Sequence, residues 1–270
     1  MSRVAITGAA GYVGSAISRG FRAVGWEVTE LGRRTGYELA KEVKIDWTGV
    51  DALVHCAWDF GLKQWEQIER VNVKGSVRVM EAARTAGVRS GVFISSLSCF
   101  PGCRSMYGGG KLEVEAEAAR LGFASVRPGL VYGERPGGMM GALEKAVKGS
   151  PVVPLIGDGS QPQYPVHEED LAALVVELCE MDCVSPEPIA AAGGEEISFR
   201  ELLRRIGARH GRKPVFVPVP WVIILAGLKA MEGLGLNPPF RSDSLTGFVF
   251  QNPAPDFSVA RGIVEFRRFE

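Results

Sequence analysis

The sequence predicts a doubly wound α/β fold, in which helices cover both faces of a parallel sheet. Short apolar runs alternate with helical patterns over residues 1–193, as expected for strand–helix–strand units. These runs are continuously apolar rather than alternating, so both faces of each strand should be buried. With 270 residues, the chain is long enough for one such domain with a smaller part attached.

The expected elements follow one another in regular order. The predicted strands are the apolar runs RVAITG, WEVTEL, ALVHCAW, SGVFISS, ASVRPGLV and PEPIAAAG. Helical patterns lie between them, near residues 12–24, 65–86, 110–121 and 168–182. A glycine-rich turn directly follows the first strand and directly precedes the first helix.

The character of the chain changes after about residue 195. SFRELLRRIGARHGRK reads as an amphipathic helix, VFVPVPW as a proline-broken extended piece, and WVIILAGLKAMEGLGL as a short apolar helix. The last is too short, and too interrupted by Lys229 and Glu232, to span a bilayer. Two interpretations remain for it: a helix packed over the core, or a segment that touches a membrane or covers an apolar substrate.

Composition narrows the class of protein. Lys plus Arg and Asp plus Glu number 31 each, so the overall charge does not favour a nucleic acid or an anionic membrane as partner. The N-terminus lacks the features of a signal peptide, and an odd number of cysteines suits a reducing compartment, so we expect a cytoplasmic protein. The cysteines are Cys56, Cys99, Cys103, Cys179 and Cys183. No cluster of His and Cys accompanies them, and no metal site is predicted.

The turn TGAAGYVG, residues 7–14, is the first chemical motif. Between a strand and a helix, Gly8 permits the tight turn, Gly11 lets the backbone approach a pyrophosphate, and Gly14 allows close packing of helix on strand. This predicts a Rossmann-type dinucleotide site, and the alternative is a purely structural glycine turn.

The second strand bears on the choice of dinucleotide. An NAD enzyme of this kind usually ends that strand with a carboxylate, but here Gly32 is followed by Arg33 and Arg34. Two guanidiniums bind a 2′-phosphate that a carboxylate would repel, which favours NADP(H) over NAD(H). The alternative is two solvated surface arginines. Asp46, expected at the end of the next strand, is predicted near the adenine amino group, and Ala57 near the adenosine.

The stretch MYGGGK, residues 106–111, places Tyr107 and Lys111 one helical turn apart on the same face. A neighbouring ammonium stabilises a phenolate and lowers the tyrosine pKa toward the range useful for proton transfer. Each intervening glycine costs a helix about 1 kcal/mol relative to alanine. We expect this cost to be offset because small residues let the helix backbone approach a flat ring closely.

At this point the sequence resembles the extended short-chain dehydrogenases/reductases, also called the NAD-dependent epimerase/dehydratase family. The resemblance covers most of the chain and rests on TGAAGYVG, on Asn72 in NVKGS, on FISSLSCF before YGGGK, on RPGLVYG and on GDGSQPQYPVHEEDLA. It implies that residues 1–192 form the Rossmann domain, with segment 134–164 on the substrate side. Residues 193–270 would form a small, mainly helical substrate-binding part.

The resemblance also implies roles for individual residues. Ser96, Tyr107 and Lys111 match the catalytic set: Tyr107 exchanges the substrate's hydroxyl proton while Ser96 hydrogen-bonds the same oxygen. For Ser96 the alternative is one of several serines at a strand end. The predicted cofactor-binding residues are Gly8, Ala10, Gly11, Tyr12, Val13, Arg33, Arg34, Asp46, Cys56, Ala57, Asn72, Ser95, Lys111, Pro128 and Val131.

Departures from the family pattern guide the choice of substrate. Leu97 and Ser98 stand where sugar-nucleotide dehydratases carry an Asp-Glu pair, which removes the acid and base of dehydration. Gln163 stands where many nucleotide-sugar enzymes hold the diphosphate with Arg, at a cost of about 1.5 to 3 kcal/mol. The predicted substrate-side residues are Trp58, Phe100, Tyr132, Gln163 and His167, of which His167 is expected to be structural or pocket-lining rather than catalytic.

Together these observations favour an NADP(H)-dependent oxidoreductase that acts on a carbonyl or secondary alcohol of a small, largely apolar substrate. One alternative is a nucleotide-sugar epimerase that uses the same three residues. Another is a catalytically silent cofactor-binding subunit or redox sensor. The resemblance further implies a homodimer formed through the helices near 65–86 and 107–121.

Overall fold

The computed structural model describes residues 1–42, 44–193, 195–236, 238 and 240–270. Its centre is a six-stranded sheet in the order β10-β5-β4-β3-β1-β2, with every neighbouring pair parallel. The strands are β1 (Arg3–Thr7), β2 (Glu27–Leu31), β3 (Ala52–His55), β4 (Ser90–Ile94), β5 (Ala124–Pro128) and β10 (Ile189–Ala191). The predicted doubly wound parallel sheet is confirmed.

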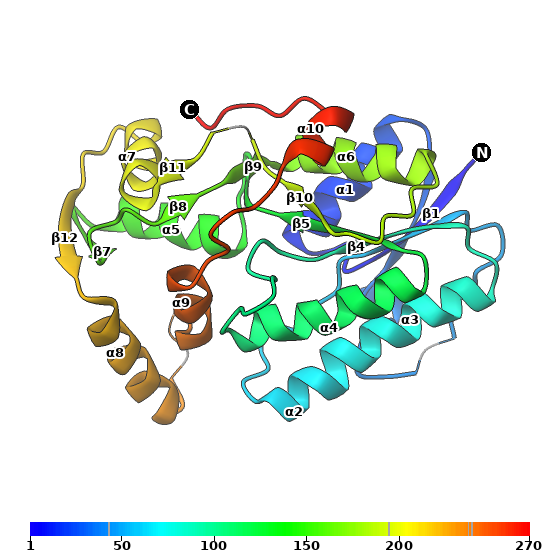
Figure 1. Cartoon of the computed structure of the whole chain (residues 1–270), viewed down its shortest axis with the longest axis horizontal. Coiled ribbons are helices and arrows are strands. Elements are labelled where there is room, and N and C mark those ends of the chain that lie inside the picture. The colour runs from blue at the N-terminus through cyan, green and yellow to red at the C-terminus, as the bar shows by residue number, and fades with distance from the viewer. Residues whose placement is uncertain (43, 194, 237, 239) are drawn as a thin grey trace.

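Helices cover both faces of this sheet (Figure 1). On one face lie α1 (Tyr12–Ala23), α6 (Glu168–Glu180) and α10 (Ser258–Ile263), and on the other α3 (Lys74–Thr85) and α4 (Met106–Arg120). Successive side chains of β1 alternate between the two cores: Val4 and Ile6 pack with α1 and α6, whereas Ala5 packs with α3 and α4. The continuously apolar strands therefore have the two-sided burial that the sequence predicts.

Two helices differ in detail from the prediction. The helix expected over 65–86 consists of α2 (Trp65–Ile68), a π-helical turn (Glu69–Val73) and α3 in one continuous run. Helix α4 begins at Met106, four residues before the expected start, so the three glycines lie inside its first turns. The turn and the glycines both lie beside the candidate site.

A second part of the structure lies beside the carboxyl ends of the strands (Figure 1). Its helices are α5 (Gly138–Gly149), α7 (Phe199–Arg209), α8 (Trp221–Gly233) and α9 (Ser242–Val249). Its strands form three short pairs: β6 (Leu130–Tyr132) with β9 (Pro165–His167), β7 (Val152–Ile156) with β12 (Val215–Val219), and β8 (Pro162–Gln163) with β11 (Ile197–Ser198). A separate apolar cluster holds this part together, with Leu155, Leu202 and Leu245 fully buried. Among the described residues, no helix combines the length and apolarity needed to cross a bilayer.

Candidate active site

The glycine turn between β1 and α1 is shaped for close approach of a ligand. Gly8 has φ +67° and its Cα packs against Ala57, where an added Cβ would lie 2.9 Å from the backbone. A Cβ on Gly14 would overlap the carbonyl oxygen of Gly8. Helix α1 begins at Tyr12 after Gly11, with no side chain capping its first N–H groups. An uncapped helix N-terminus behind a glycine cradle fits the pyrophosphate of a dinucleotide.

The turn lies where the order of strands in the sheet reverses: β2 is added on one side of β1, and β3 on the other. In open α/β sheets, ligands bind at the carboxyl ends of the strands at such a point. Cys56 and Ala57, which follow β3, donate their backbone N–H groups to the Thr7 hydroxyl at 3.1 and 3.2 Å. Their backbone therefore forms the wall of the cradle beside Gly8.

A buried hydrogen-bond chain fixes this wall. His55 Nδ1 lies 2.7 Å from the Thr7 hydroxyl, and Nε2 lies 2.8 Å from Ser76 Oγ. Ser76 in turn donates to the carbonyl of Asn72 at 2.6 Å, so Nε2 carries the imidazole proton. Burial lowers the pKa of His55 to about 3, which keeps the ring neutral. His55 is a structural residue of the core.

Asn72 holds the loop that follows β3. Its Oδ1 accepts the Asp59 N–H at 2.8 Å, and its Nδ2 donates to the Asp59 carbonyl at 3.0 Å. The side chain is fully buried in the π-helical turn, which widens the helix where the amide projects. The structure thus gives Asn72 a role in shaping the site through Asp59.

The residues expected at the adenosine end lie at the surface. Arg33 and Arg34 follow β2 in an exposed turn, and Arg33 is 3.5 Å from the carboxylate of Asp59. The prediction that Asp46 ends a strand is wrong: within the described part of 41–50 there is no strand. Asp46 lies instead in an exposed loop, where its carboxylate accepts the Thr48 N–H at 3.0 Å. The apolar run that would make a strand there is too short, since only Ile45 and Trp47 are apolar between Lys44 and Thr48.

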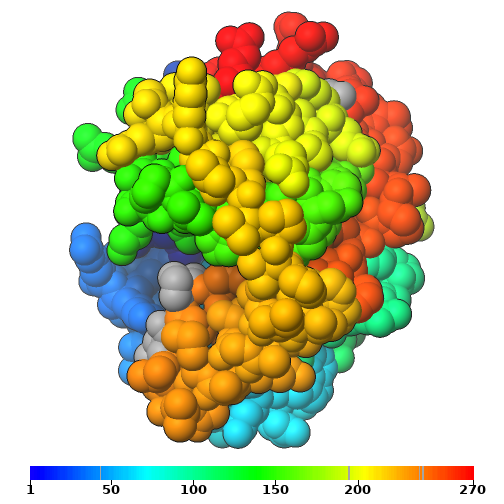
Figure 2. Space-filling view, turned by 90° about the vertical axis from the view of Figure 1, so that its left-hand side faces the viewer, coloured from blue at the N-terminus to red at the C-terminus, as the bar shows by residue number. Residues whose placement is uncertain are grey.

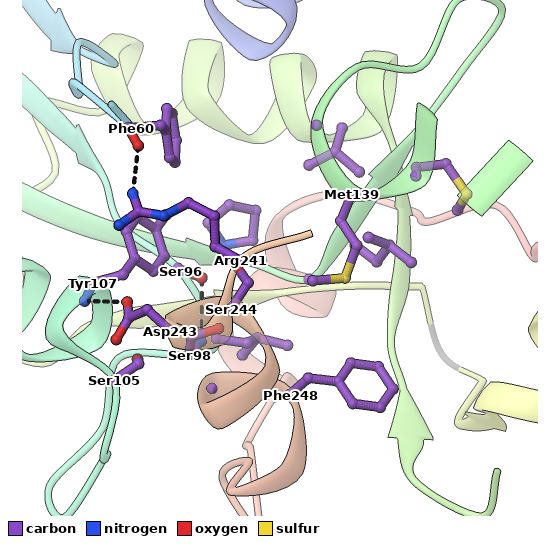
Figure 3. A pocket seen from close by; sticks show the side chains of 18 of the residues that line it. Phe60, Ser96, Ser98, Ser105, Tyr107, Met139, Arg241, Asp243, Ser244 and Phe248 are labelled. Carbon is purple, nitrogen blue, oxygen red and sulfur yellow. Dashed lines mark hydrogen bonds between the residues drawn. The ribbon is translucent and has the colours of Figure 1, made fainter. Parts of the chain in front are cut away.

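Ser96, Tyr107 and Lys111 converge at the carboxyl end of β4. Ser96 lies two residues beyond the strand; its Oγ accepts the Ser98 N–H at 3.1 Å (Figure 3), and its hydroxyl acts on Tyr107 to lower the pKa of that phenol. Lys111, one turn along α4, is buried and its Nζ donates to the Ile94 carbonyl at 2.7 Å. The hydroxyl of Ser95 is buried, and no hydrogen bond to it is found among the described atoms.

Burial controls the protonation of this set. It raises the pKa of Tyr107 to about 12, against the opposite effect of the Ser96 hydroxyl, and lowers the pKa of Lys111 to about 7. Lys111 Nζ lies 4.3 Å from the centre of the Trp58 ring, but 5.9 Å from that of Tyr107. The expected lowering of the tyrosine pKa by Lys111 is therefore not found, and Tyr107 is a neutral phenol able to donate a proton.

The three glycines of α4 differ in what surrounds them. A Cβ on Gly108 would overlap the Ser98 carbonyl, whereas one on Gly109 would find its nearest neighbour, Trp65, at 3.8 Å. A Cβ on Gly110 would come within 3.3 Å of the Trp58 indole. The flat ring that the helix backbone approaches is thus that of Trp58, which also packs edge-on against Tyr107 at 5.7 Å.

The start of α4 is held by its own N-cap, Ser105, whose Oγ accepts the Gly108 N–H at 3.0 Å, and by a residue of the second part. The Asp243 carboxylate accepts the N–H groups of Met106 at 2.7 Å and Tyr107 at 3.1 Å (Figure 3). Two residues earlier, Arg241 Nη1 donates to the carbonyls of Phe60 and Leu62 at 2.7 and 2.8 Å. We call Arg241 and Asp243 the clasp, because they join the loop after β3 and the start of α4 from the same side.

A cavity of about 520 Å³ runs from the glycine turn to the clasp. Of the predicted site residues, its wall includes Tyr12, Val13, Trp58, Ser96, Tyr107, Pro128, Val131 and Gln163. Sequence reasoning missed several others, which come from α5, α9 and the segment before α9: Met139, Phe240, Arg241, Asp243 and Phe248. No spaced motif marks them.

Three residues predicted on the substrate side are absent from the described wall. Phe100 lies in the loop before α4, outside the cavity. Tyr132 donates its hydroxyl to the Arg268 carbonyl at 3.1 Å and packs against His167. His167 caps α6, with Nδ1 accepting the Glu169 N–H at 3.3 Å. The structure therefore places His167 in a structural role, as expected, but away from the cavity.

The fold and the glycine cradle define an NAD(P)-dependent enzyme of the short-chain dehydrogenase/reductase superfamily. The chain belongs to the NAD dependent epimerase/dehydratase family, whose sequence model matches residues 4–190. The family resemblance predicted from the motifs is confirmed.

Curated relatives of the chain include two reductases. It is 28% identical over 237 residues to a ceramide reductase of Caulobacter vibrioides, covering 80% of this chain and 73% of the relative. It is 29% identical over 272 residues to a dTDP-4-dehydro-6-deoxy-D-allose reductase of Streptomyces bikiniensis, covering 77% and 81%. Among solved structures, MoeE5 in complex with UDP-glucose and NAD superposes with a TM-score of 0.66 at 24% identity, covering 81% of this chain and 85% of the other. That likeness concerns the fold.

Proposed function

We propose that the protein is an NADP(H)-dependent oxidoreductase that interconverts a carbonyl and a secondary alcohol in a small, largely apolar substrate. One observation carries the proposal: the Tyr107 phenol, which burial keeps neutral, and the Ser96 hydroxyl both face a cavity whose wall is mainly apolar. A neutral phenol beside a hydroxyl provides two O–H groups for one substrate oxygen. This is the arrangement that protonation of a developing alkoxide requires.

In the proposed mechanism, the bound nicotinamide supplies the hydride chemistry, and the protein supplies position and the proton. Ser96 and Tyr107 orient the substrate oxygen, and Tyr107 donates its proton to that oxygen during reduction or accepts it during oxidation. The Asp243 cap fixes the backbone of Tyr107 itself. Lys111, whose pKa burial lowers to about 7, is able to hold or release a proton near neutral pH.

The preference for NADP(H) rests on Arg33 and Arg34. Arg33 is 79% exposed, so its guanidinium can turn to a 2′-phosphate with little loss of burial. Its ion pair with Asp59 at 3.5 Å is long and solvated, worth at most about 1 kcal/mol. A charge-assisted fork to a phosphate is stronger.

Two features favour an apolar carbonyl over a nucleotide sugar. Gln163 Nε2 donates to the Pro162 carbonyl at 2.7 Å, so this amide is engaged by the backbone rather than turned to a diphosphate. Beyond Ser96 the wall continues with Leu97, which has no acid–base function. Of the two reductases among the curated relatives, the ceramide reductase supports the same direction, whereas the dTDP-4-dehydro-6-deoxy-D-allose reductase supports reduction but is named for a nucleotide sugar.

The first test is calorimetric titration of the apo protein with NADP(H) and NAD(H), repeated on Arg33→Ala. We expect a preference for NADP of at least tenfold, about 1.4 kcal/mol, that falls in the variant. Arg22→Ala is the matched control, because Arg22, in α1, is also an exposed arginine paired with a carboxylate, that of Glu30 in β2. Equal binding of NAD would refute the assignment of Arg33.

Turnover separates the remaining alternatives. Consumption of NADPH with a panel of apolar ketones is the expected result. Tightly held oxidised cofactor in the purified protein, with no net turnover, would support an epimerase instead. Binding without any chemistry would support a silent subunit. A homodimer through the run α2–α3 and through α4 remains a prediction, which light scattering tests.

A further inference from the structure

Helix α8 is apolar on both sides. Trp221, Ile224 and Leu228 turn toward the apolar cluster of the second part. On the opposite side, Val222 and Ile223 are 52% and 60% exposed. A helix on the surface of a soluble domain ordinarily presents polar side chains there, so α8 has an outer side suited to an apolar environment.

The apolar surface continues beyond α8. Exposed valines of β12 and of its partner β7 precede the helix, and exposed leucines follow it. Figure 2 shows the β12 and α8 segments, in gold and orange, side by side on one side of the molecule. We call this surface the apolar face; its residues are Val152, Val215, Val217, Val222, Ile223, Met231, Leu234 and Leu236.

Basic residues accompany the apolar face. Residues 202–231 contain no Asp or Glu, although the whole chain has equal numbers of acidic and basic residues. Within the described part of the chain, Arg212, Lys213 and Lys229 are exposed and form no ion pair in the structure. Positive charge is thus concentrated in the part of the chain whose apolar side chains are exposed.

We propose that the apolar face docks onto a membrane surface that contains anionic lipid. An apolar surface flanked by Lys and Arg has the chemistry of a segment that lies in the interface of an anionic bilayer. A second copy of the chain fits less well, because a two-fold contact centred on α8 would bring the Lys229 side chains of both copies together.

The position of the cavity gives this docking a consequence. Figure 2 shows a hollow between the green segment that includes α5 and the orange segment that includes α8, with dark blue N-terminal atoms visible inside it. The cavity wall contains Met139 of α5, Tyr12 at the start of α1, and Phe240 from the segment between α8 and α9. On a docked molecule the cavity would therefore lie beside the lipid, where an apolar substrate is concentrated.

The test is flotation of the full chain with phosphatidylcholine vesicles, with and without phosphatidylglycerol. We expect binding to the anionic vesicles, weakened by added salt. Lys229→Gln should lower the partition constant about fivefold, since each basic residue near the surface contributes about 1 kcal/mol. Ile223→Ser should lower it about tenfold or more, by loss of apolar contact. Val24→Ser is the matched control, because Val24 is 55% exposed at the end of α1, away from the apolar face.

Failure of this proposal is distinct from failure of the proposed function, because cofactor titration of Ile223→Ser should match that of the unmodified protein. Absence of vesicle binding would overturn the proposal. The proposal would also be overturned if Lys229→Gln and Ile223→Ser bound the vesicles as strongly as the control Val24→Ser. A dimer in light scattering that Ile223→Ser dissociates, without vesicle binding, would assign the face to a second copy.

Discussion

Replacement of Asp243 tests whether the second part of the chain positions the proton donor. Asp243→Ala removes two hydrogen bonds from a carboxylate to the Met106 and Tyr107 N–H groups. Bonds to charged groups contribute about 1.5 to 3 kcal/mol each, but water from the cavity can replace part of this. The lost interaction with the helix dipole adds about 0.3 to 1 kcal/mol. A net loss of about 2 kcal/mol corresponds to about a 30-fold effect.

Because Tyr107 is the second residue of α4, fraying of this turn displaces the phenol but not the glycine cradle. We therefore expect kcat with an accepted ketone to fall about 30-fold in Asp243→Ala and about tenfold in Asp243→Asn, which keeps one acceptor oxygen. The dissociation constant of NADP should change less than twofold. Steady-state kinetics and calorimetry on the same preparations measure both quantities.

Asp256→Ala is the matched control. Asp256 accepts the Ser258 N–H at 2.8 Å beside α10, so its loss removes a carboxylate that holds a backbone N–H outside the cavity. Because this bond is single and exposed, Asp256→Ala should lose less stability than Asp243→Ala, and only Asp243→Ala should lose turnover. If Asp243→Ala folds normally and keeps kcat within twofold, the clasp does not position Tyr107 and the reasoning is refuted.

Three further predictions concern α4. Tyr107→Phe should lower kcat by about 10²-fold or more without weakening NADP binding; retained turnover would exclude Tyr107 as the proton donor. Because burial lowers the pKa of Lys111 to about 7, the unfolded chain binds a proton that the folded protein has released between about pH 7 and pH 10. The contribution of Lys111 to stability should therefore rise with pH in this window by up to about 1.4 kcal/mol per unit, measured as the difference in urea unfolding between the unmodified protein and Lys111→Met, because the buried cysteines act in the opposite direction in both. Gly109→Ala should stabilise the protein by up to about 1 kcal/mol in thermal melts, whereas Gly108→Ala, blocked by the Ser98 carbonyl, should destabilise it; equal effects would contradict the packing.

The sequence was sufficient to predict the sheet and the glycine turn between β1 and α1 for a physical reason. Buried parallel strands require continuous apolar runs, and a phosphate-binding turn requires glycines at fixed spacing, so both leave a pattern in the chain. Tyr107 and Lys111 were likewise found by helical spacing. The roles of these residues remain predictions until the variants are measured.

Other features leave no such pattern. The clasp consists of Arg241, just before α9, and Asp243, within it. These side chains bind residues about 180 and about 140 positions earlier in the chain. Such long-range contacts leave no local periodicity in the sequence. The π-helical turn inserts one extra residue where Asn72 is buried, and no residue type in Glu69–Val73 marks such a turn in the sequence. Tyr132 and His167 follow family motifs, yet both are engaged in packing between β6, β9 and the C-terminal segment.

Two parts of the chain build the wall of the cavity, and this explains why the substrate is harder to predict from the sequence than the cofactor. The family model ends at residue 190, whereas Phe240, Phe248 and the clasp come from the chain beyond it. The cofactor end must match one fixed molecule, so its glycines and strand ends are constrained to a recognisable form. The substrate end needs only apolar volume and a few polar atoms in place, which many sequences provide. Variants of Phe240 and Phe248 should therefore change which ketones are accepted while leaving NADP affinity intact, and the reverse outcome would place the substrate at the other end of the cavity.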